Sequence, residues 1–142
     1  MQTCGNANQP AVKNGSMTRP EITRTRDLTF SNWIRRNLPN SETGFSVSDV
    51  DFMLWNWQRR EVMFVEVKTH GKELSTGQRR QFRRMHDWMT KGTAGTEWNY
   101  KGWVIVTFEN TSFDDGKCYI SSINMTQPIE VTEARLIELL SF

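Results

Sequence analysis

Two apolar segments separated by a few polar residues constrain the fold of this chain more than any other feature. Residues 48–57 and 61–69 are rich in Val, Phe, Met and Trp, and a short turn around Gln58-Arg59 joins them. Runs of this length that are apolar on both faces are typical of strands covered on both sides by other elements. The pattern therefore predicts an antiparallel hairpin within a larger sheet.

Four charged residues interrupt the hairpin, namely Asp49, Asp51, Glu66 and Lys68. Side chains alternate between the faces of a strand, so Asp49 and Asp51 share one face, as do Glu66 and Lys68. A four-residue turn over residues 57–60 would place Asp51 opposite Glu66 and Asp49 opposite Lys68, with Cβ atoms about 4.5–5.5 Å apart. Three carboxylates and one ammonium would then converge, whereas a one-residue slip would separate the two pairs.

Opposed carboxylates in a partly buried patch repel one another, and either a shared proton or a bound hard cation relieves the repulsion. Mg²⁺ prefers oxygen ligands, commonly one or two carboxylates with water and phosphate oxygens. A lysine nearby can orient a water molecule or stabilise charge on a phosphate. The set therefore suits phosphodiester hydrolysis. The alternative is that Asp49 and Lys68 form a plain salt bridge, with Asp51 or Glu66 reaching solvent at a strand end.

The remaining elements predict a mixed sheet flanked by helices, of class α/β with α+β as the alternative. Helices are expected over residues 27–38, 75–91 and 132–141, and further strands over residues 103–109 and 117–123. Residues 1–24 are polar and lack apolar periodicity, which predicts a flexible leader. Residues 25–142 then form a single domain.

The hairpin resembles the PD-(D/E)xK nuclease superfamily, in particular its small resolvase-like and phage-type members. Asp51 is followed, after fourteen residues, by Glu66-Val67-Lys68 on the next strand. The resemblance covers about residues 48–88 and implies a restriction-endonuclease-like fold with an αβββαβ core. It also implies that Asp51, Glu66 and the carbonyl of Val67 hold Mg²⁺ or Mn²⁺, while Lys68 assists the attacking water.

Two features depart from the family pattern. Val50 stands where the motif has proline, and the first predicted helix lacks an obvious glutamate. Glu42 is the nearest candidate for that glutamate, and Asp49 is a candidate auxiliary acid.

The helix after the motif carries Gln78 on the same stripe as Phe82 and Met85. Many family members have a residue here that reaches the active site, which would make Gln78 a catalytic residue. Gln78 also fits a capping box with Ser75, and both roles can hold. The opposite face is basic and predicts phosphate contacts or a solvated surface; its residues are Arg79, Arg80, Arg83, Arg84 and Lys91.

The tryptophans allow more than one interpretation. Trp55 and Trp57 share a face near the hairpin turn, and we expect them to pack in a core or an interface rather than to stack on bases. Trp98, Tyr100 and Trp103 lie in or near a segment flanked by glycines. The sequence leaves open whether these three pack or stack.

Length and composition exclude several classes of protein. A chain of 142 residues can bury one core without disulfides or a structural metal, and it has only two cysteines and no CxxC motif. No apolar run approaches the ~18–20 residues of a membrane span, and no signal-peptide pattern is present. We expect an intracellular, cytoplasmic protein without a membrane partner. The net charge of +2 is small for a nucleic-acid binder, so the distribution of charge matters more than its sum.

Together these observations predict a Mg²⁺- or Mn²⁺-dependent endonuclease selective for DNA structure, with DNA favoured over RNA. A chain of this size has little room for a separate specificity domain, so a partner or a homodimer is one way to add selectivity. Two alternatives stay open. One is a non-catalytic nucleic-acid-binding module on the same fold, and the other is a small interaction or inhibitor protein that uses its tryptophans.

Overall fold

The computed structural model describes residues 29–44, 47–125 and 127–142. The chain divides into two compact units, Met1–Ser46 and Val47–Phe142, and each is described by itself.

In the first unit, α1 (Thr29–Asn37) is followed by the 3-10 helix η1 (Ser41–Thr43). Helix α1 confirms the described part of the helix predicted over residues 27–38, and its Phe30 and Trp33 rings stack with centroids 5.7 Å apart. The leader predicted over residues 1–24 lies outside the described residues.

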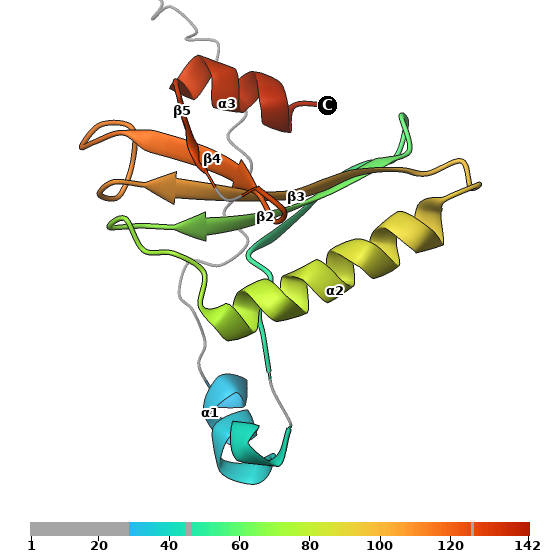
Figure 1. Ribbon diagram of the computed structural model, residues 1–142, viewed down its shortest axis with the longest axis vertical. Coiled ribbons are helices and arrows are strands. Elements are labelled where there is room, and N and C mark those ends of the chain that lie inside the picture. Colours follow the sequence, from blue (N-terminus) through green and yellow to red (C-terminus); the bar gives the residue numbers. More distant parts are fainter. Residues whose placement is uncertain (1–28, 45–46, 126) are drawn as a thin grey trace, which may run out of the picture. The chain divides into compact units, whose positions relative to one another are not determined.

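The second unit is built on a five-stranded sheet whose strands lie in sequence order (Figure 1). The strands are β1 (Phe52–Asn56), β2 (Glu61–Lys68), β3 (Asn99–Phe108), β4 (Cys118–Ser122) and β5 (Ile129–Val131). β2 and β3 run parallel, and the other neighbouring pairs run antiparallel. This mixed sheet with helices on both faces confirms the predicted α/β class and its restriction-endonuclease-like arrangement (Figure 1).

Details of the strands differ from the prediction. β1 begins at Phe52 rather than at residue 48, and β3 begins at Asn99 rather than at residue 103. The sequence pattern does not predict β5, because three residues are too few to show alternation. Within the described residues two strands precede α2, whereas the αβββαβ order has three strands before its second helix.

The hairpin of β1 and β2 forms in the predicted register. Asn56 pairs with Glu61, and the ladder continues to Phe52 opposite Val65. The turn contains four residues, and its last, Arg60, has a left-handed φ of 55°. Such a backbone is uncommon outside glycine and is tolerated in tight hairpin turns.

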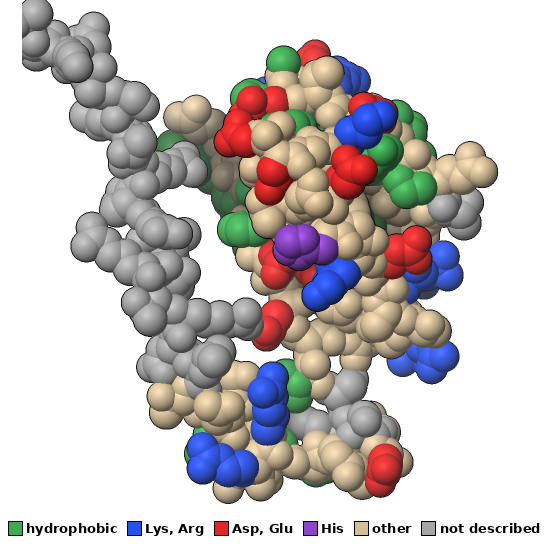
Figure 2. Space-filling view, turned by 90° about the vertical axis from the view of Figure 1, so that its left-hand side faces the viewer, with side chains coloured by type: hydrophobic (Ala, Val, Ile, Leu, Met, Phe, Trp, Pro, Cys, Tyr) green, Lys and Arg blue, Asp and Glu red, His purple; other side chains and the backbone are tan. Residues whose placement is uncertain are grey.

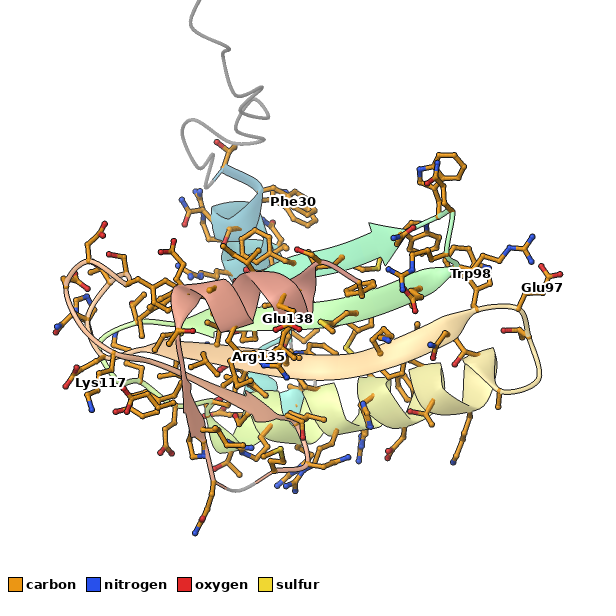
Figure 3. All side chains as sticks on the ribbon, turned by 90° about the horizontal axis from the view of Figure 1, so that it is seen from above. Phe30, Glu97, Trp98, Lys117, Arg135 and Glu138 are labelled. Carbon is orange, nitrogen blue, oxygen red and sulfur yellow. The ribbon has the colours of Figure 1, made fainter. Side chains whose placement is uncertain are left out.

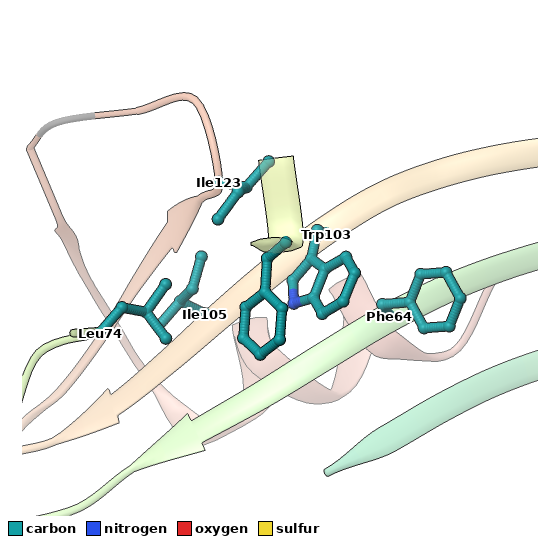
Figure 4. Packing of buried hydrophobic residues seen from close by; sticks show 6 residues of the cluster. Phe64, Leu74, Trp103, Ile105 and Ile123 are labelled. Atoms are coloured by element: carbon teal, nitrogen blue, oxygen red, sulfur yellow. The ribbon is translucent and has the colours of Figure 1, made fainter. Parts of the chain in front are cut away.

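Helix α2 (Thr76–Thr93) covers one face of the sheet and builds the first core (Figure 1). Phe82 of the helix stacks on Trp103 of β3 with ring centroids 4.3 Å apart, and both side chains are fully buried. The other buried members of this cluster are Phe64, Leu74, Ile105 and Ile123 (Figure 4).

Helix α3 (Glu133–Leu140) covers the opposite face, where Leu136 packs into a second core (Figure 1). The other buried members of this core are Met63, Val65, Val106 and Cys118. Even-numbered residues of β2 therefore face α2 and odd-numbered ones face α3, as strand alternation requires. None of the helices in the described part of the chain is long and apolar enough to cross a membrane.

A β-bulge in β3 sets which of its residues face α2. Val62 pairs with Tyr100 and Phe64 pairs with Trp103, so β3 has one residue more than β2 over this stretch. Gly102 lies in the bulge with a φ of 105°, a conformation that strongly favours glycine.

Strand β1 is the edge of the sheet and is more exposed than its apolar sequence predicts. Trp55 is 52% exposed and Trp57 is 71% exposed, so of the two expected environments the core is wrong, and packing in an interface stays a prediction. Helix α2 packs on Tyr100 and Trp103 of β3, which leaves the α2-facing side of β1 largely uncovered. On the other face, Leu54 packs against the second core.

Candidate active site

The centre of the site is an ion pair on β2 between the buried Glu66 and the half-buried Lys68. Glu66 is only 3% exposed, and its Oε1 lies 2.8 Å from the ammonium nitrogen of Lys68. Both side chains face α2, because residues two apart in a strand share a face. The second carboxylate oxygen of Glu66, Oε2, is buried and has no hydrogen-bond partner among the described residues. A buried oxygen in this state costs free energy unless a ligand satisfies it.

Asp51 approaches β2 at the point where the hairpin ladder ends. Its Oδ2 accepts a hydrogen bond of 2.9 Å from the main-chain nitrogen of Val67. The N–H and C=O groups of one strand residue point toward the same neighbouring strand. The Val67 carbonyl is therefore directed toward the same edge of β2 as the Val67 nitrogen, which is the edge on which Asp51 lies.

Gln78 lies close to Lys68 and caps its own helix. Its Oε1 accepts hydrogen bonds from the main-chain nitrogen of Ser75 at 3.3 Å and from Lys68 Nζ at 3.4 Å. The Ser75 hydroxyl accepts from the Gln78 nitrogen at 3.1 Å, which completes the capping box. The structural and the site-directed interpretation of Gln78 are thus both compatible with one side-chain position.

The expected convergence of three carboxylates does not form. The described residues contain no group of three or more His, Cys, Asp or Glu side chains that could hold a metal ion. Strand pairing stops at Phe52, so Asp49 and Asp51 precede the ladder, and the Asp51 carboxylate accepts from the main-chain nitrogen of Val67. Glu42 lies in η1, in the other unit, and its role stays a prediction.

Asp51, Glu66 and Val67 nevertheless fit a divalent cation such as Mg²⁺, which needs few protein ligands. Mg²⁺ is usually bound by one or two carboxylates and keeps several waters or phosphate oxygens. Glu66 offers a buried oxygen without a partner, and Asp51 has one carboxylate oxygen beyond the one bound to Val67. The carbonyl of Val67 would add a third oxygen at the same edge.

The sheet register adds two neighbours that the sequence analysis did not find. Lys68 pairs with Thr107 of β3, which in turn pairs with Tyr119 of β4. Paired residues share a face, so both hydroxyl groups lie on the same side of the sheet as Lys68. No sequence signal points to them, because only the order of the strands brings these distant residues together.

A loop after β3 lies beside the end of β2. The His70 nitrogen donates to the Asn110 oxygen at 2.7 Å, and His70 has a left-handed φ of 57°. In the same loop, hydrogen bonds from the Thr111 hydroxyl and from the Ser112 and Thr111 nitrogens lower the pKa of Asp115. Figure 2 views this end of the molecule and shows acidic and basic side chains interspersed over it.

The basic residues of α2 surround three sides of the helix rather than forming a single stripe. At 100° per residue, Arg79 and Arg83 lie on the flank that also carries His86, which contacts Tyr100 of β3. Arg84 lies on the opposite flank, and Arg80 and Lys91 lie on the side away from the sheet. All of these except the half-buried Arg79 are exposed.

The Asp before the sheet ladder, the Glu-x-Lys of β2 and the Gln of α2 together match the residue pattern of PD-(D/E)xK nucleases. A family model described as the VRR-NUC domain matches residues 11–90, and the chain belongs to this family of the PD-(D/E)xK nuclease superfamily. The matched segment contains Asp51, Glu66, Lys68 and Gln78. Comparisons with curated proteins and with solved structures gave no match. Membership makes the chain a nuclease and implies a divalent metal in general.

Proposed function

We propose that this protein is a Mg²⁺- or Mn²⁺-dependent endonuclease that hydrolyses phosphodiester bonds of structured DNA. The observation that carries the proposal is the state of Glu66. One of its oxygens is bound to Lys68, while the other is buried on the side of the sheet covered by α2 and has no hydrogen-bond partner in the part of the chain that the structure describes. A divalent cation would satisfy this oxygen, and the proposed nuclease reaction requires such a cation.

Asp51, Glu66 and the Val67 carbonyl would hold the metal, which supplies positive charge to the scissile phosphate. The remaining chemistry belongs to the side chains of the chain. Water adds to phosphorus, and the bond between phosphorus and the leaving sugar oxygen breaks, which leaves one phosphate end and one hydroxyl end.

Lys68 is the residue proposed to act on the reacting atoms. Its ammonium has three donors, of which Glu66 and Gln78 each accept one. The remaining donor can orient the attacking water or stabilise charge on a phosphate oxygen. Gln78 then acts as a positioning residue, because it fixes the direction of the ammonium group.

The arginines of α2 are proposed to hold the DNA backbone. Four arginines within six positions of α2 repel one another unless anions lie near them, and phosphates supply such anions. Phosphate contacts position a duplex but carry no base information, which supports selectivity for DNA shape over sequence. DNA is the proposed substrate, with RNA as the comparison in the test.

The test is cleavage of labelled single-stranded, duplex, flap and four-way-junction DNAs, with matched RNA strands, in Mg²⁺, Mn²⁺ or EDTA. A closed circular DNA identifies endonuclease action, because it has no ends. We expect metal-dependent cleavage by the wild type, a loss of about 10²–10³-fold in Lys68→Ala, and no detectable cleavage in Glu66→Gln. Lys117→Ala removes a lysine that pairs with Glu130 elsewhere and serves as the matched control.

Full metal-dependent cleavage by both Lys68→Ala and Glu66→Gln would contradict this mechanism. Salt-sensitive DNA binding without cleavage in any lane would instead support a binding module on the same fold.

A further inference from the structure

The aromatic side chains at the hairpin end of the sheet carry one inference beyond the cleavage site. We propose that Trp55 and Trp98 form a stacking surface for unpaired DNA bases on strands that extend away from the cleavage site. This inference rests on the proposed function, since it takes DNA as the molecule bound at the site.

Trp55 and Trp98 form an aromatic pair in which Trp55 is exposed to solvent and Trp98 is half-buried. Their ring centroids lie 4.4 Å apart with planes inclined by 51°, and Trp55 is 52% exposed. Trp98 lies beside the hairpin turn (Figure 3), where the nitrogen of Asn99 donates to the oxygen of Arg60 at 2.8 Å. Indole rings fixed in this way offer a flat apolar face to a base and lose little conformational entropy on binding.

The aromatic pair is on the same face of the sheet as the site. Trp55 pairs with Val62, and Val62, Glu66 and Lys68 all face α2 along β2. Because β1 starts one residue after Asp51, Trp55 lies about 13 Å along the strand from Asp51 at the usual rise per residue. A DNA strand leaving the site along β1 would therefore reach the pair within a few nucleotides.

The flank of α2 borders the same path. The Ser48 hydroxyl donates to Gln81 of α2, so this flank of the helix faces the start of β1. Arg84 and Trp88 follow Gln81 by three and seven residues and lie on the same flank. Trp88 is 67% exposed, although it is one of the largest apolar side chains of the helix.

Cations accompany the aromatic pair at the hairpin turn. Arg59 pairs with Glu61, and Arg60 pairs with Glu97. The two arginine side chains remain 62% and 49% exposed. Glu97 is also exposed, at 76%, so the Arg60–Glu97 pair is weak enough to exchange for a phosphate, whereas Arg59 is paired with the buried Glu61. Lys101, which lies 3.5 Å from Glu61, also lines a groove of about 600 Å³ next to Trp98.

The combination of aromatic and cationic side chains at the hairpin turn favours nucleic acid over a protein as the binding partner. The cores of protein interfaces are depleted of charged residues, whereas here Arg59, Arg60 and Lys101 lie at the same end of the sheet as the aromatic pair. Surfaces for single-stranded nucleic acid combine aromatic platforms with a positively charged path for the backbone. The occupant that matches both features is a single strand of DNA.

The test measures DNA binding in EDTA, where cleavage cannot occur. Fluorescence anisotropy would follow a labelled single strand of about 20 nucleotides and a blunt duplex of the same length. Trp55→Leu keeps an apolar side chain but removes the ring, and Trp55→Tyr restores a ring. Phe52→Leu is the matched control, because Phe52 is 56% exposed on the same strand but pairs with Val65 on the other face.

We expect Trp55→Leu to weaken single-strand binding by about 5- to 100-fold and duplex binding by less than twofold. Trp55→Tyr should recover most of the affinity, and Phe52→Leu should match the wild type. The proposal is overturned if Trp55→Leu binds the single strand normally, if both DNAs lose affinity equally, or if Phe52→Leu loses as much. It is also overturned if the substitution alters only the oligomeric state in sedimentation, which would assign the surface to a second copy.

Failure of this inference and failure of the proposed function give different results. Metal-dependent cleavage with normal single-strand binding by Trp55→Leu removes only the stacking surface. If the wild type cleaves no DNA but Trp55→Leu selectively loses single-strand binding, only the nuclease mechanism is contradicted.

Discussion

The ammonium nitrogen of Lys68 lies 2.8 Å from Oε1 of Glu66, whose side chain is only 4% exposed. The two residues are neighbours on one face of a single strand, so the pair forms without a contribution from another element. The cation proposed to act on phosphate thus also neutralises a buried carboxylate. Stability and catalysis are therefore coupled at this position.

Replacing Lys68 by alanine should destabilise the fold as well as reduce cleavage. Glu66 would remain buried without its cation, which typically costs about 3–5 kcal/mol of unfolding free energy. Urea denaturation followed by circular dichroism would measure the loss. Combining Lys68→Met with Glu66→Gln should recover most of that stability, because neither charge then remains. A double variant as unstable as Lys68→Ala would show that the pair is not the cause.

Mg²⁺ should stabilise the wild-type fold independently of any cleavage. A cation at ten times its Kd adds about 1.4 kcal/mol, which raises the Tm of a chain of this size by roughly 3–6 °C. Calorimetric scans without DNA, in Mg²⁺ and in EDTA, would show the shift. Asp51→Asn and Glu66→Gln should each abolish it, and an undiminished shift in both variants would place the cation elsewhere.

The two roles of Gln78 can be separated by two substitutions. Gln78→Glu preserves a capping box with Ser75, so the unfolding free energy should change by less than about 0.5 kcal/mol. Cleavage should nevertheless fall, because a carboxylate would hold the Lys68 ammonium more tightly than an amide does. Ser75→Ala should cost about 1 kcal/mol of stability and leave kcat unchanged. Equal effects of both substitutions on kcat would indicate that Gln78 acts only through its helix.

The sequence predicts the hairpin register once the turn is taken as residues 57–60, because a slip by one residue would move every side chain of one strand to the other face of the sheet. It does not predict where pairing stops. Asp51 leaves the ladder because its side chain, rather than a main-chain carbonyl, accepts from Val67. Nor does apolar content reveal that β1 is an edge strand, because this depends on where α2 packs. The exposure of Trp55 is a property of strand order, which local patterns do not contain.

Acid should weaken the fold partly through Asp115. Its pKa is lowered in the folded state, chiefly by the hydrogen bond from the Thr111 hydroxyl and then by main-chain donors. A carboxyl group whose pKa is lowered in the folded state stabilises the fold at pH values above its unfolded pKa of 3.8. That contribution is lost as the pH falls through the folded pKa. The stability difference between wild type and Asp115→Asn should therefore be constant from about pH 7 to 5 and narrow below about pH 4. Urea titrations at each pH would test this, and a constant difference down to pH 3 would contradict it.

Two glycines should respond oppositely to alanine. Gly102→Ala meets no neighbouring atom within 4 Å, yet its φ of 105° should make the substitution cost roughly 1–3 kcal/mol. Gly92 lies near the end of α2 in equally open space, and alanine there should stabilise the helix by up to about 1 kcal/mol. Thermal unfolding of the two variants side by side would measure the contrast. A neutral Gly102→Ala would show that the bulge adapts without strain.

The extra residue at Gly102 also determines which side chains at the two ends of β3 share a face of the sheet. Tyr100 and Trp103 are an odd number of positions apart, and in an uninterrupted strand they would lie on opposite faces. The bulge cancels that inversion, so Tyr100 and Trp103 both lie on the face of the sheet that carries Lys68. Deleting this single glycine would leave Tyr100 and Trp103 two positions apart in a regular strand, so both side chains would still face α2. Keeping all the residues but straightening the bulge would instead turn one end of the strand over, and one helix would lose its partner surface while every side chain stayed present.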